Sequence, residues 1–240
     1  MSVNIFISYH KPDELYNLPK EYKPIFVGKD CKTVRLGYKT LEKNIDYNDN
    51  FFKQIEYYDN IKNNISYQNS YVSELTSAYW VWKNLKFNND DYIGFCAYRR
   101  IINYPPDYKS YKVLTNYYGN KPNETIKDAW ILPFLYDDYP KLLHIITNNF
   151  PEDYVKFKRF ERELMKNMPL RNNFLMKYPY FDEYCSRLFS YNEIFWKRKD
   201  EWKLYGHMIE IISSFILWDL GAKNELHYIS PSHDGTILYK

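Results

Sequence analysis

Residues 69–100, NSYVSELTSAYWVWKNLKFNNDDYIGFCAYRR, decide the class of fold. Ser70 is a suitable N-cap, and Glu74 lies in the first turn, where a carboxylate suits the helix dipole. Apolar residues then recur at helical spacing until the polar turn FNNDD, so we expect one helix here. Residues 92–98, YIGFCAY, are short, apolar and flanked by polar residues, which predicts a buried strand.

Two arginines, Arg99 and Arg100, follow this predicted strand at once. Ligands of open α/β sheets bind outside the carboxyl ends of the strands, and a guanidinium group can grip phosphate oxygens with two N–H donors. The pair therefore indicates an anion clamp for a pyrophosphate or a similar group. The alternative is that both are surface arginines in ordinary ion pairs.

The other segments predict strands mainly in the first half of the chain and helices in the second. Residues 3–7 and 23–27 read as strands, and residues 129–132 are a further candidate. A strand–loop–strand–helix–strand order argues for an α/β sheet. Residues 103–127 read as a long loop. Helical patterns cover 137–148, 152–167, 181–203 and 205–220, and the tail HYISPS reads as a short returning strand.

The composition is that of a globular chain rather than of a disordered one. The 240 residues suit one large domain or two small ones, with 45% hydrophobic and 26% charged residues. Aromatic residues reach 20%, and 27 of them are Tyr, which can pack in a core or line a sugar-binding cleft.

Net charge, cysteine spacing and hydropathy restrict the cellular compartment and the binding partners that we expect. The net charge of +3 is too small for a nucleic-acid footprint, although it suits weak attraction to an anionic membrane surface or to a phosphate-bearing ligand. Cys31, Cys96 and Cys185 show neither a disulfide framework nor zinc-ligand spacing, so we expect a reducing cytoplasm. The first residues lack the pattern of a signal peptide, and no stretch reaches the roughly 20 apolar residues of a membrane span.

Two further segments place polar groups near strand ends. His10 and Lys11 follow the first predicted strand. The segment 59–66, DNIKNNIS, supplies side-chain amides and a carboxylate just before the predicted helix, and such groups can hold ribose hydroxyls or a sugar. Each also has an explanation without a ligand: His10 and Lys11 are ordinary surface residues, and the segment 59–66 is a capped loop.

Several stretches together carry a resemblance to a known family. They are SYHKP at 8–12, PIFVGK at 24–29, DNIKNNIS at 59–66, NSYVSELTSAYWVWKN at 69–84, DYIGFCAYRR at 91–100, NNFLMKYPYFDEYCSRLF at 172–189 and YGHMIEIISSFILW at 205–218. The chain resembles a bacterial family from capsule and exopolysaccharide gene clusters, long labelled a domain of unknown function and related to glycosyltransferases of the A type. The resemblance spans almost the whole chain, and its ELT…YWxWKN and YRR combination is long and specific.

The chain departs from that family at three positions. Ala97 stands where the family has His in HYRR, Asn63 replaces an Asp, and Ile211 replaces an Arg. The missing His removes a hydrogen-bond donor, a ligand or a proton carrier from the suspected site.

The resemblance implies an α/β fold, a GT-A-like single domain over 1–240, with a mostly parallel central sheet flanked by helices and a helical C-terminal half. Residues 1–135 would be the sheet-rich part that binds a nucleotide-sugar, and 136–240 the mainly helical part on the acceptor side. The implied activity is hexosyl transfer from a nucleotide-sugar donor, for which we guess a UDP-hexose, to a cell-surface glycan or lipid-linked oligosaccharide acceptor in capsule or related polysaccharide biosynthesis. We expect a cytoplasmic protein, with the inner face of the membrane and peripheral membrane association as options.

The resemblance leaves the role of a metal open. A-type enzymes usually hold the donor pyrophosphate through a metal on an Asp-x-Asp motif, which this sequence lacks. Mn²⁺ or Mg²⁺ therefore stays an option without an identified ligand, and we name no metal-binding residue. Arg99 and Arg100 would stabilise the leaving nucleoside diphosphate in place of some or all of the metal's work.

The remaining roles come from the family's motifs. Glu210 in the last helix is the first candidate for the general base of an inverting transfer and Glu74 the second; both are equally consistent with structural roles, and a retaining transfer needs no such base. Asn172 in RNNFLM is the candidate on the acceptor side, and the tyrosines of 103–118 are candidates for a lid over the donor. The candidate donor-binding residues are His10, Lys11, Asp59, Asn60, Asn64, Ser66, Glu74 and Tyr98.

Two other functions stay open at this stage. One is a non-catalytic nucleotide- or carbohydrate-binding module of the same fold, which the Ala97 departure favours. The other is a nucleic-acid-binding protein that uses lysines and aromatic side chains. The weak net charge and the lack of a clustered basic stripe argue against nucleic acid as a partner.

Overall fold

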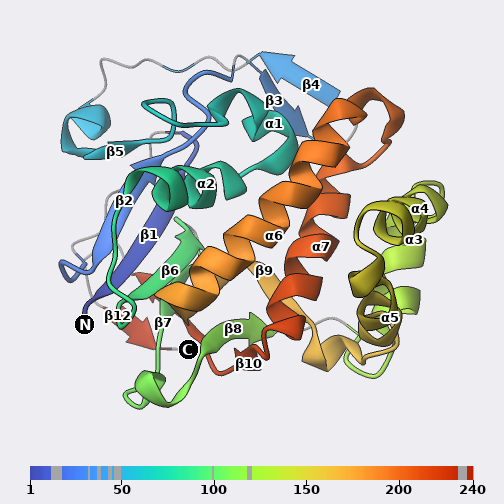
Figure 1. Ribbon diagram of the computed structural model, residues 1–240. Coiled ribbons are helices and arrows are strands. Elements are labelled where there is room, and N and C mark those ends of the chain that lie inside the picture. Colours follow the sequence, from blue (N-terminus) through green and yellow to red (C-terminus); the bar gives the residue numbers. More distant parts are fainter. Residues whose placement is uncertain are drawn as a thin grey trace.

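A computed structural model shows a central β-sheet with helices across the face seen in Figure 1. The described residues are 1–11, 18–31, 33–36, 39–42, 45, 50–98, 100–117, 121–231 and 237–239. The helices on this face are α1 (Asn69–Val72), α2 (Leu75–Asn84), α6 (Tyr178–Lys197) and α7 (Tyr205–Asp219). A group of shorter helices, α3 (Leu132–Leu135), α4 (Tyr139–Asn149) and α5 (Pro151–Phe160), lies to one side.

The central sheet of the described chain has seven strands in the order β10-β8-β9-β6-β1-β2-β5. They are β1 (Val3–Tyr9), β2 (Tyr22–Phe26), β5 (Tyr57–Tyr58), β6 (Tyr92–Ala97), β8 (Val113–Tyr117), β9 (Pro169–Lys177) and β10 (Lys223–Asn224). Strand β9 runs antiparallel to β6 and β8, whereas the other pairs are parallel. The expected α/β fold with a mostly parallel sheet and flanking helices is confirmed.

Two smaller sheets complete the strands. The first has the order β12-β11-β7, formed by β7 (Ile101–Asn103), β11 (His227–Pro231) and β12 (Ile237–Tyr239). The second is an antiparallel pair of β3 (Thr33–Leu36) and β4 (Lys39–Glu42). The returning strand expected from the tail HYISPS is therefore present as β11.

Strands β1 and β6 are buried on both faces, as expected of central parallel strands. On the helix side, Phe6 stacks on Phe95 with ring centroids 5.4 Å apart. On the other side, Ile5 and Ile7 belong to a separate apolar cluster that includes Cys96. This two-sided burial explains why YIGFCAY reads as a nearly continuous apolar run.

The four helices expected after residue 136 are present as α4, α5, α6 and α7, with shifted ends. The strand expected over 129–132 is wrong, because Lys127–Ile131 forms a π-helical turn that runs into α3. Three consecutive buried apolar residues, Ala129 to Ile131, fit either period, so spacing alone could not separate helix from strand. The long loop expected over 103–127 is also partly wrong, since it contains β8.

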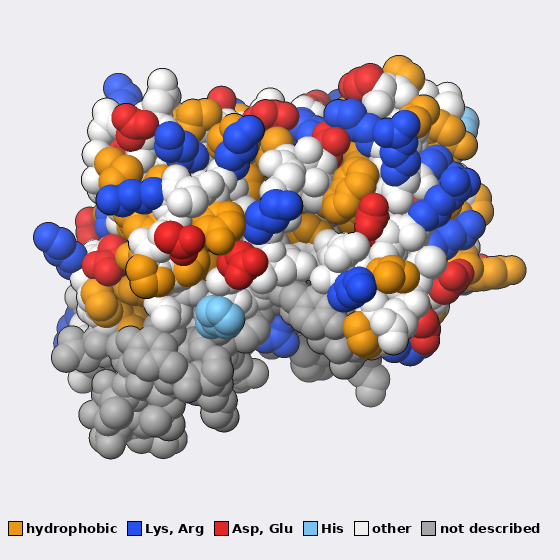
Figure 2. Space-filling model, turned by 90° about the horizontal axis from the view of Figure 1, so that it is seen from below, with side chains coloured by type: hydrophobic (Ala, Val, Ile, Leu, Met, Phe, Trp, Pro, Cys, Tyr) orange, Lys and Arg blue, Asp and Glu red, His pale blue; other side chains and the backbone are white. Residues whose placement is uncertain are grey.

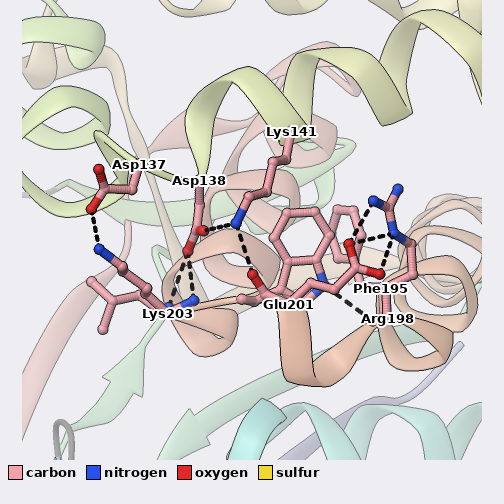
Figure 3. Close-up of polar contacts among 9 residues, drawn as sticks. Asp137, Asp138, Lys141, Phe195, Arg198, Glu201 and Lys203 are labelled. Carbon is pink, nitrogen blue, oxygen red and sulfur yellow. Dashed lines mark hydrogen bonds and ion pairs between the residues drawn. The ribbon is translucent and has the colours of Figure 1, made fainter.

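A polar clasp joins α4 to the start of α7 (Figure 3). The buried carboxylate of Asp138 accepts the backbone N–H groups of Lys203 at 3.0 Å and Leu204 at 3.2 Å. Lys141 donates from Nζ both to Asp138, at 3.2 Å, and to the carbonyl of Glu201, at 2.8 Å. One carboxylate thereby fixes the chain entering α7, the helix that carries Glu210.

The surface carries mixed charge. On the face shown in Figure 2, Lys and Arg side chains gather toward the right and elsewhere alternate with Asp and Glu. None of the helices in the described part of the chain has the length and hydropathy of a membrane-spanning segment.

Candidate active site

The carboxyl ends of β1, β2, β5 and β6 meet at one edge of the central sheet, because these strands run parallel. The segments that leave this edge carry most of the residues that the sequence pointed to. They are His10 and Lys11 after β1, the segment 59–66 after β5, and Tyr98 and Arg100 after β6. In α/β folds this edge is the place where ligands bind.

His10 and Tyr98 meet at this edge. Their rings are in an edge-on contact with centroids 5.4 Å apart, and Tyr98 also stacks on Tyr9 at 5.2 Å. Tyr98 is buried, so its ring forms part of the wall beneath the edge. Lys11, by contrast, is exposed.

Of the two arginines, the structure describes only Arg100. The backbone N–H of Arg100 donates to the carbonyl of Ala97 at 2.8 Å, and the Arg100 side chain is exposed. Arg99 lies outside the described residues. The anion clamp of Arg99 and Arg100 therefore stays a prediction. The side chain of Arg100 is exposed just after the end of β6.

Asp59 is fully buried between the end of β2 and the segment 59–66. The Gly28 N–H donates to its two carboxylate oxygens at 3.0 and 2.9 Å, and the Ser66 hydroxyl donates to one of them at 2.7 Å. Burial raises the pKa of this carboxyl above its ordinary value, while the hydrogen bonds act in the opposite direction. A contribution of Asp59 or Ser66 to donor binding would act through the loop that they hold.

The two candidate asparagines of this segment differ in what they offer a ligand. Asn64 closes a local turn, because its Oδ1 accepts the Ser66 N–H at 3.2 Å and its Nδ2 donates to the Lys62 carbonyl at 3.0 Å. Asn60 donates from Nδ2 to Asp30 at 3.0 Å, and its buried Oδ1 has no partner among the described residues.

The single helix expected from Ser70 onward is wrong, because α1 ends at Val72 and α2 begins at Leu75. Ser73 has φ 49° and ψ −131°, and Glu74 has φ −63° and ψ −13°. These are the two central positions of a type II′ turn, the first of which favours glycine. Ser73 is therefore strained, and the apolar spacing that continues through the turn hides the break from the sequence.

Asn69 holds the strained turn. Its carbonyl accepts the Ser73 N–H at 2.8 Å, and its Nδ2 donates to the Ser73 carbonyl at 2.7 Å and to Thr76 Oγ1 at 3.1 Å. At Gly28, which has φ 70°, an added Cβ would lie 2.4 Å from Asn69 Oδ1. Glycine at position 28 thus leaves the room that this asparagine needs.

The turn directs Glu74 toward the strands. Glu74 is half-buried and borders a cavity of about 10 Å³ with Ser8, Phe95 and Phe174 among its neighbours. These residues belong to β1, β6 and β9, and the cavity is too small for more than about one water molecule. Sequence reasoning named Glu74 but missed Asn69 and Ser73, which set its position.

Glu210 is half-buried on α7. One turn before it, a Cβ added at Gly206 would lie 3.1 Å from the Tyr71 carbonyl of α1. One turn after it, Ser214 Oγ donates to the Pro169 carbonyl at the start of β9, at 3.0 Å. Residues four apart share a helix face, so Glu210 faces the region between α1 and the first residues of β9.

Glu74 lies in the turn between α1 and α2, and Glu210 lies on α7, which packs against α1. Asn172 belongs to β9, the neighbour of β6, although its side chain lies outside the described residues.

The lid expected from the tyrosines of 103–118 is wrong for two of them. Tyr108 meets Tyr92 edge-on at 5.0 Å, and Tyr104 meets Tyr108 at 4.9 Å. Tyr92 is the first residue of β6, so these rings pack at the edge of the sheet opposite to the candidate site.

The role of a divalent metal stays a prediction without an identified ligand. Within the described ranges, no group of three or more His, Cys, Asp or Glu side chains lies close enough to hold an ion. The buried Asp59 accepts hydrogen bonds from Gly28 and Ser66, Glu74 lies in the turn between α1 and α2, and Glu210 lies on α7.

Comparisons with known proteins agree with the observed fold. A family described as a domain of unknown function (DUF4422) matches residues 4–117. Among curated proteins there is no match. The apo structure of the WbbM bifunctional glycosyltransferase is similar, with a TM-score of 0.66 and 21% sequence identity, over 100% of this chain and 46% of that chain. The chain spans less than half the length of that protein and shares the fold of the part that it matches.

Proposed function

We propose that this chain is a glycosyltransferase that moves a hexose from a nucleotide-sugar, with UDP-hexose as the first donor to test, to a glycan or lipid-linked acceptor. The observation that carries the proposal is the likeness of the whole chain to part of a glycosyltransferase, at a TM-score of 0.66. The polar side chains at the carboxyl edge of the sheet support it, because A-type folds bind their donors there. A cytoplasmic place at the inner membrane face, in capsule or related polysaccharide synthesis, belongs to the same proposal.

In this reaction the bond between the anomeric carbon and the donor phosphate oxygen breaks, and the acceptor oxygen bonds to that carbon. An inverting transfer needs a carboxylate that takes the acceptor's proton. We assign this step first to Glu210, which is half-buried and faces the start of β9, and second to Glu74. A retaining transfer needs no such base, so the anomeric configuration of the product, read by NMR, tests this assignment.

Negative charge grows on the leaving nucleoside diphosphate and calls for fixed positive charge nearby. We assign this to Arg99 and Arg100, with His10 and Lys11 leaving the neighbouring strand. Asn60, in the segment after β5, is assigned to the donor, and Asn172 of β9 to the acceptor side.

The experiment measures nucleotide release from UDP-glucose, UDP-galactose and GDP-mannose, with and without Mn²⁺, in the presence of glycan acceptors. We expect Glu210→Gln to lower turnover by about 10²-fold or more, and Arg100→Ala by about 10²-fold. Glu124→Gln and Arg162→Ala remove exposed charges to which the proposal gives no role, and they serve as matched controls with unchanged turnover.

Thermal shifts with the same nucleotides separate catalysis from binding, because a ligand that binds the native state raises its melting temperature. A shift with UDP but no turnover of any donor would favour the non-catalytic binding module, to which Ala97 already points. If no nucleotide raises the melting temperature and no donor is turned over, both functions are refuted.

A further inference from the structure

A second hollow is lined by residues of α2, of α6 and of the segment 65–68. Figure 1 shows these two helices on the same face of the sheet. The hollow has a volume of about 400 Å³, which is in the range of small-molecule sites. Its walls carry two groups of rings, one of Tyr79, Trp82 and Phe189 and one of Tyr67 and Trp196. We call it the α2–α6 groove, and none of the residues assigned above to donor or acceptor lines it.

The rings of the groove are held in place before any ligand arrives. Trp82 donates from Nε1 to Asp182 at 2.7 Å. Tyr67 is 52% exposed, yet its hydroxyl accepts a hydrogen bond from Gln68 at 3.1 Å, and its ring meets Trp196 edge-on at 5.6 Å. A ligand that stacks on such rings loses little affinity to ordering the protein.

The floor of the groove is polar and almost closed to solvent. Gln68 and Asn192 are each 4% exposed, and Asn192 Nδ2 donates to Gln68 Oε1 at 2.8 Å. The Tyr205 hydroxyl donates to Asn192 Oδ1 at 2.8 Å. Each side-chain amide carries two N–H donors, and the bonds within the described chain use one from each. The second N–H of each amide has no acceptor among the described residues, and both side chains line the groove.

The charges of the groove balance each other. Its charged lining residues are Lys83 and Glu193. Lys83 lies with Nζ 3.4 Å from the Trp82 ring centroid, and Glu193 pairs with Lys197 at 2.9 Å. A diphosphate would need an excess of positive charge, whereas an uncharged sugar offers C–H groups to ring faces and hydroxyls to amides.

The neighbouring hollow, of about 390 Å³, shares Ser186 and Ser190 with the groove but has a different chemistry. Its Arg187 donates to Asp153 at 3.0 Å and to Asp219 at 2.8 Å. These charges join α5, α6 and α7 to one another, so this hollow has a structural role.

We propose that the α2–α6 groove binds uncharged sugar units of the acceptor glycan that lie away from the reacting hydroxyl. The inference rests on the proposed function. The groove adjoins the candidate site, since Tyr67 and Gln68 directly follow the segment 59–66. On its other side, Trp196 meets Tyr71 of α1 edge-on at 5.3 Å, and α1 leads into the turn that holds Glu74. A glycan that extends from the site therefore has a path into the groove.

The test uses an array of neutral oligosaccharides of glucose, galactose, mannose and rhamnose, followed by calorimetry on those that bind. We expect Tyr67→Ala to weaken binding by about ten-fold or more and to raise the acceptor KM to the same extent, with donor hydrolysis unchanged. Tyr136→Ala, which removes a tyrosine that is 75% exposed next to α3, is the matched control and leaves binding unchanged.

The outcomes separate this inference from the proposed function. Absent glycan binding, or binding that Tyr67→Ala leaves intact, overturns the groove as a sugar site even where donor turnover is normal. Glycan binding that Tyr67→Ala abolishes, in a protein that turns over no donor, supports the groove and refutes glycosyl transfer. A dimer in light scattering that Tyr67→Ala converts to a monomer would make the groove an interface between copies and refute the inference.

Discussion

At the scale of single residues, the backbone conformation of Ser73 sets the position of Glu74. Its positive φ breaks an otherwise continuous helical pattern and turns Glu74 toward β1, β6 and β9. A conformation of this kind costs on the order of 1–3 kcal/mol and persists only where neighbours enforce it. Here Asn69 and Thr76 bind the Ser73 carbonyl.

Replacing Ser73 with glycine tests this strain. Glycine adopts the first central position of a type II′ turn without penalty, so Ser73→Gly should raise the free energy of unfolding by about 1 kcal/mol. Urea denaturation measures the change. Ser70→Gly, in the body of α1, is the matched control and should lower stability, because glycine is unfavourable in a helix. Equal losses in both variants would show that Ser73 is not strained.

Asp91 gives a residue-scale prediction for pH. Burial by itself raises the pKa of this carboxyl, but hydrogen bonds from the N–H groups of Asn88 and Ser2 and from the Ser2 hydroxyl outweigh it and hold the pKa below its ordinary value of 3.8. A lowered pKa stabilises the folded state above the unfolded value, and this stability is lost as pH falls through 3.8 and below.

The measurement is the melting temperature as a function of pH from neutral to strongly acidic solution. Asp91→Asn should be less stable than the wild type near neutrality and should lose less stability on acidification. Its neighbour Asp90 is 73% exposed at the side chain, so Asp90→Asn should follow the wild-type curve. Parallel curves for wild type and Asp91→Asn would refute this account.

At the scale of elements, the clasp at Asp138 joins α4 to the chain entering α7 (Figure 3). Asp138→Ala leaves two backbone N–H groups and the Lys141 ammonium without this carboxylate, so it should cost about 2 kcal/mol of unfolding free energy. Asp137→Ala is the matched control, since the Asp137 side chain is 57% exposed and pairs with Lys203 at the surface. Its cost should stay within about 0.5 kcal/mol. Chemical denaturation measures the free energy of unfolding of both variants. Equal losses would show that Asp138 does not hold α4 to the chain entering α7.

At the scale of the whole molecule, the central sheet joins both halves of the chain. Strand β9 lies between β6 and β8, and β10 pairs with the far side of β8. A fragment of residues 1–135 therefore lacks both neighbours of β8 and the helices α6 and α7 that cover one face. The nucleotide-binding and acceptor-side parts that the sequence suggests share one sheet.

We expect the fragment 1–135 to be unfolded, because it cannot bury the apolar face of its sheet. Circular dichroism should show no cooperative thermal transition for the fragment and one transition for the full chain. A fragment with a cooperative transition and a dispersed NMR spectrum would contradict this expectation.

Local pattern was enough to predict part of the fold. Strands β1, β2 and β6 and helices α6 and α7 follow from runs of apolar residues with a clear period. Strands β8 and β9 were not predicted in this way, because their sequences VLTNY and PLRNNFLMK lack such a period. They become strands through pairing with each other and with β6.

The sequence by itself determined the alternation of strands and helices and the polar residues that follow the strands, since periodicity and residue type are local properties. Only the tertiary structure decided which of these residues meet. It placed His10 beside Tyr98, turned Glu74 against Ser8 and Phe174, and opened a groove between α2 and α6. The physical reason is that β-pairing and helix packing are stabilised by partners distant in the chain, whose energies no local pattern contains. The turn at Ser73 stayed hidden because the helical spacing of apolar residues continues through it.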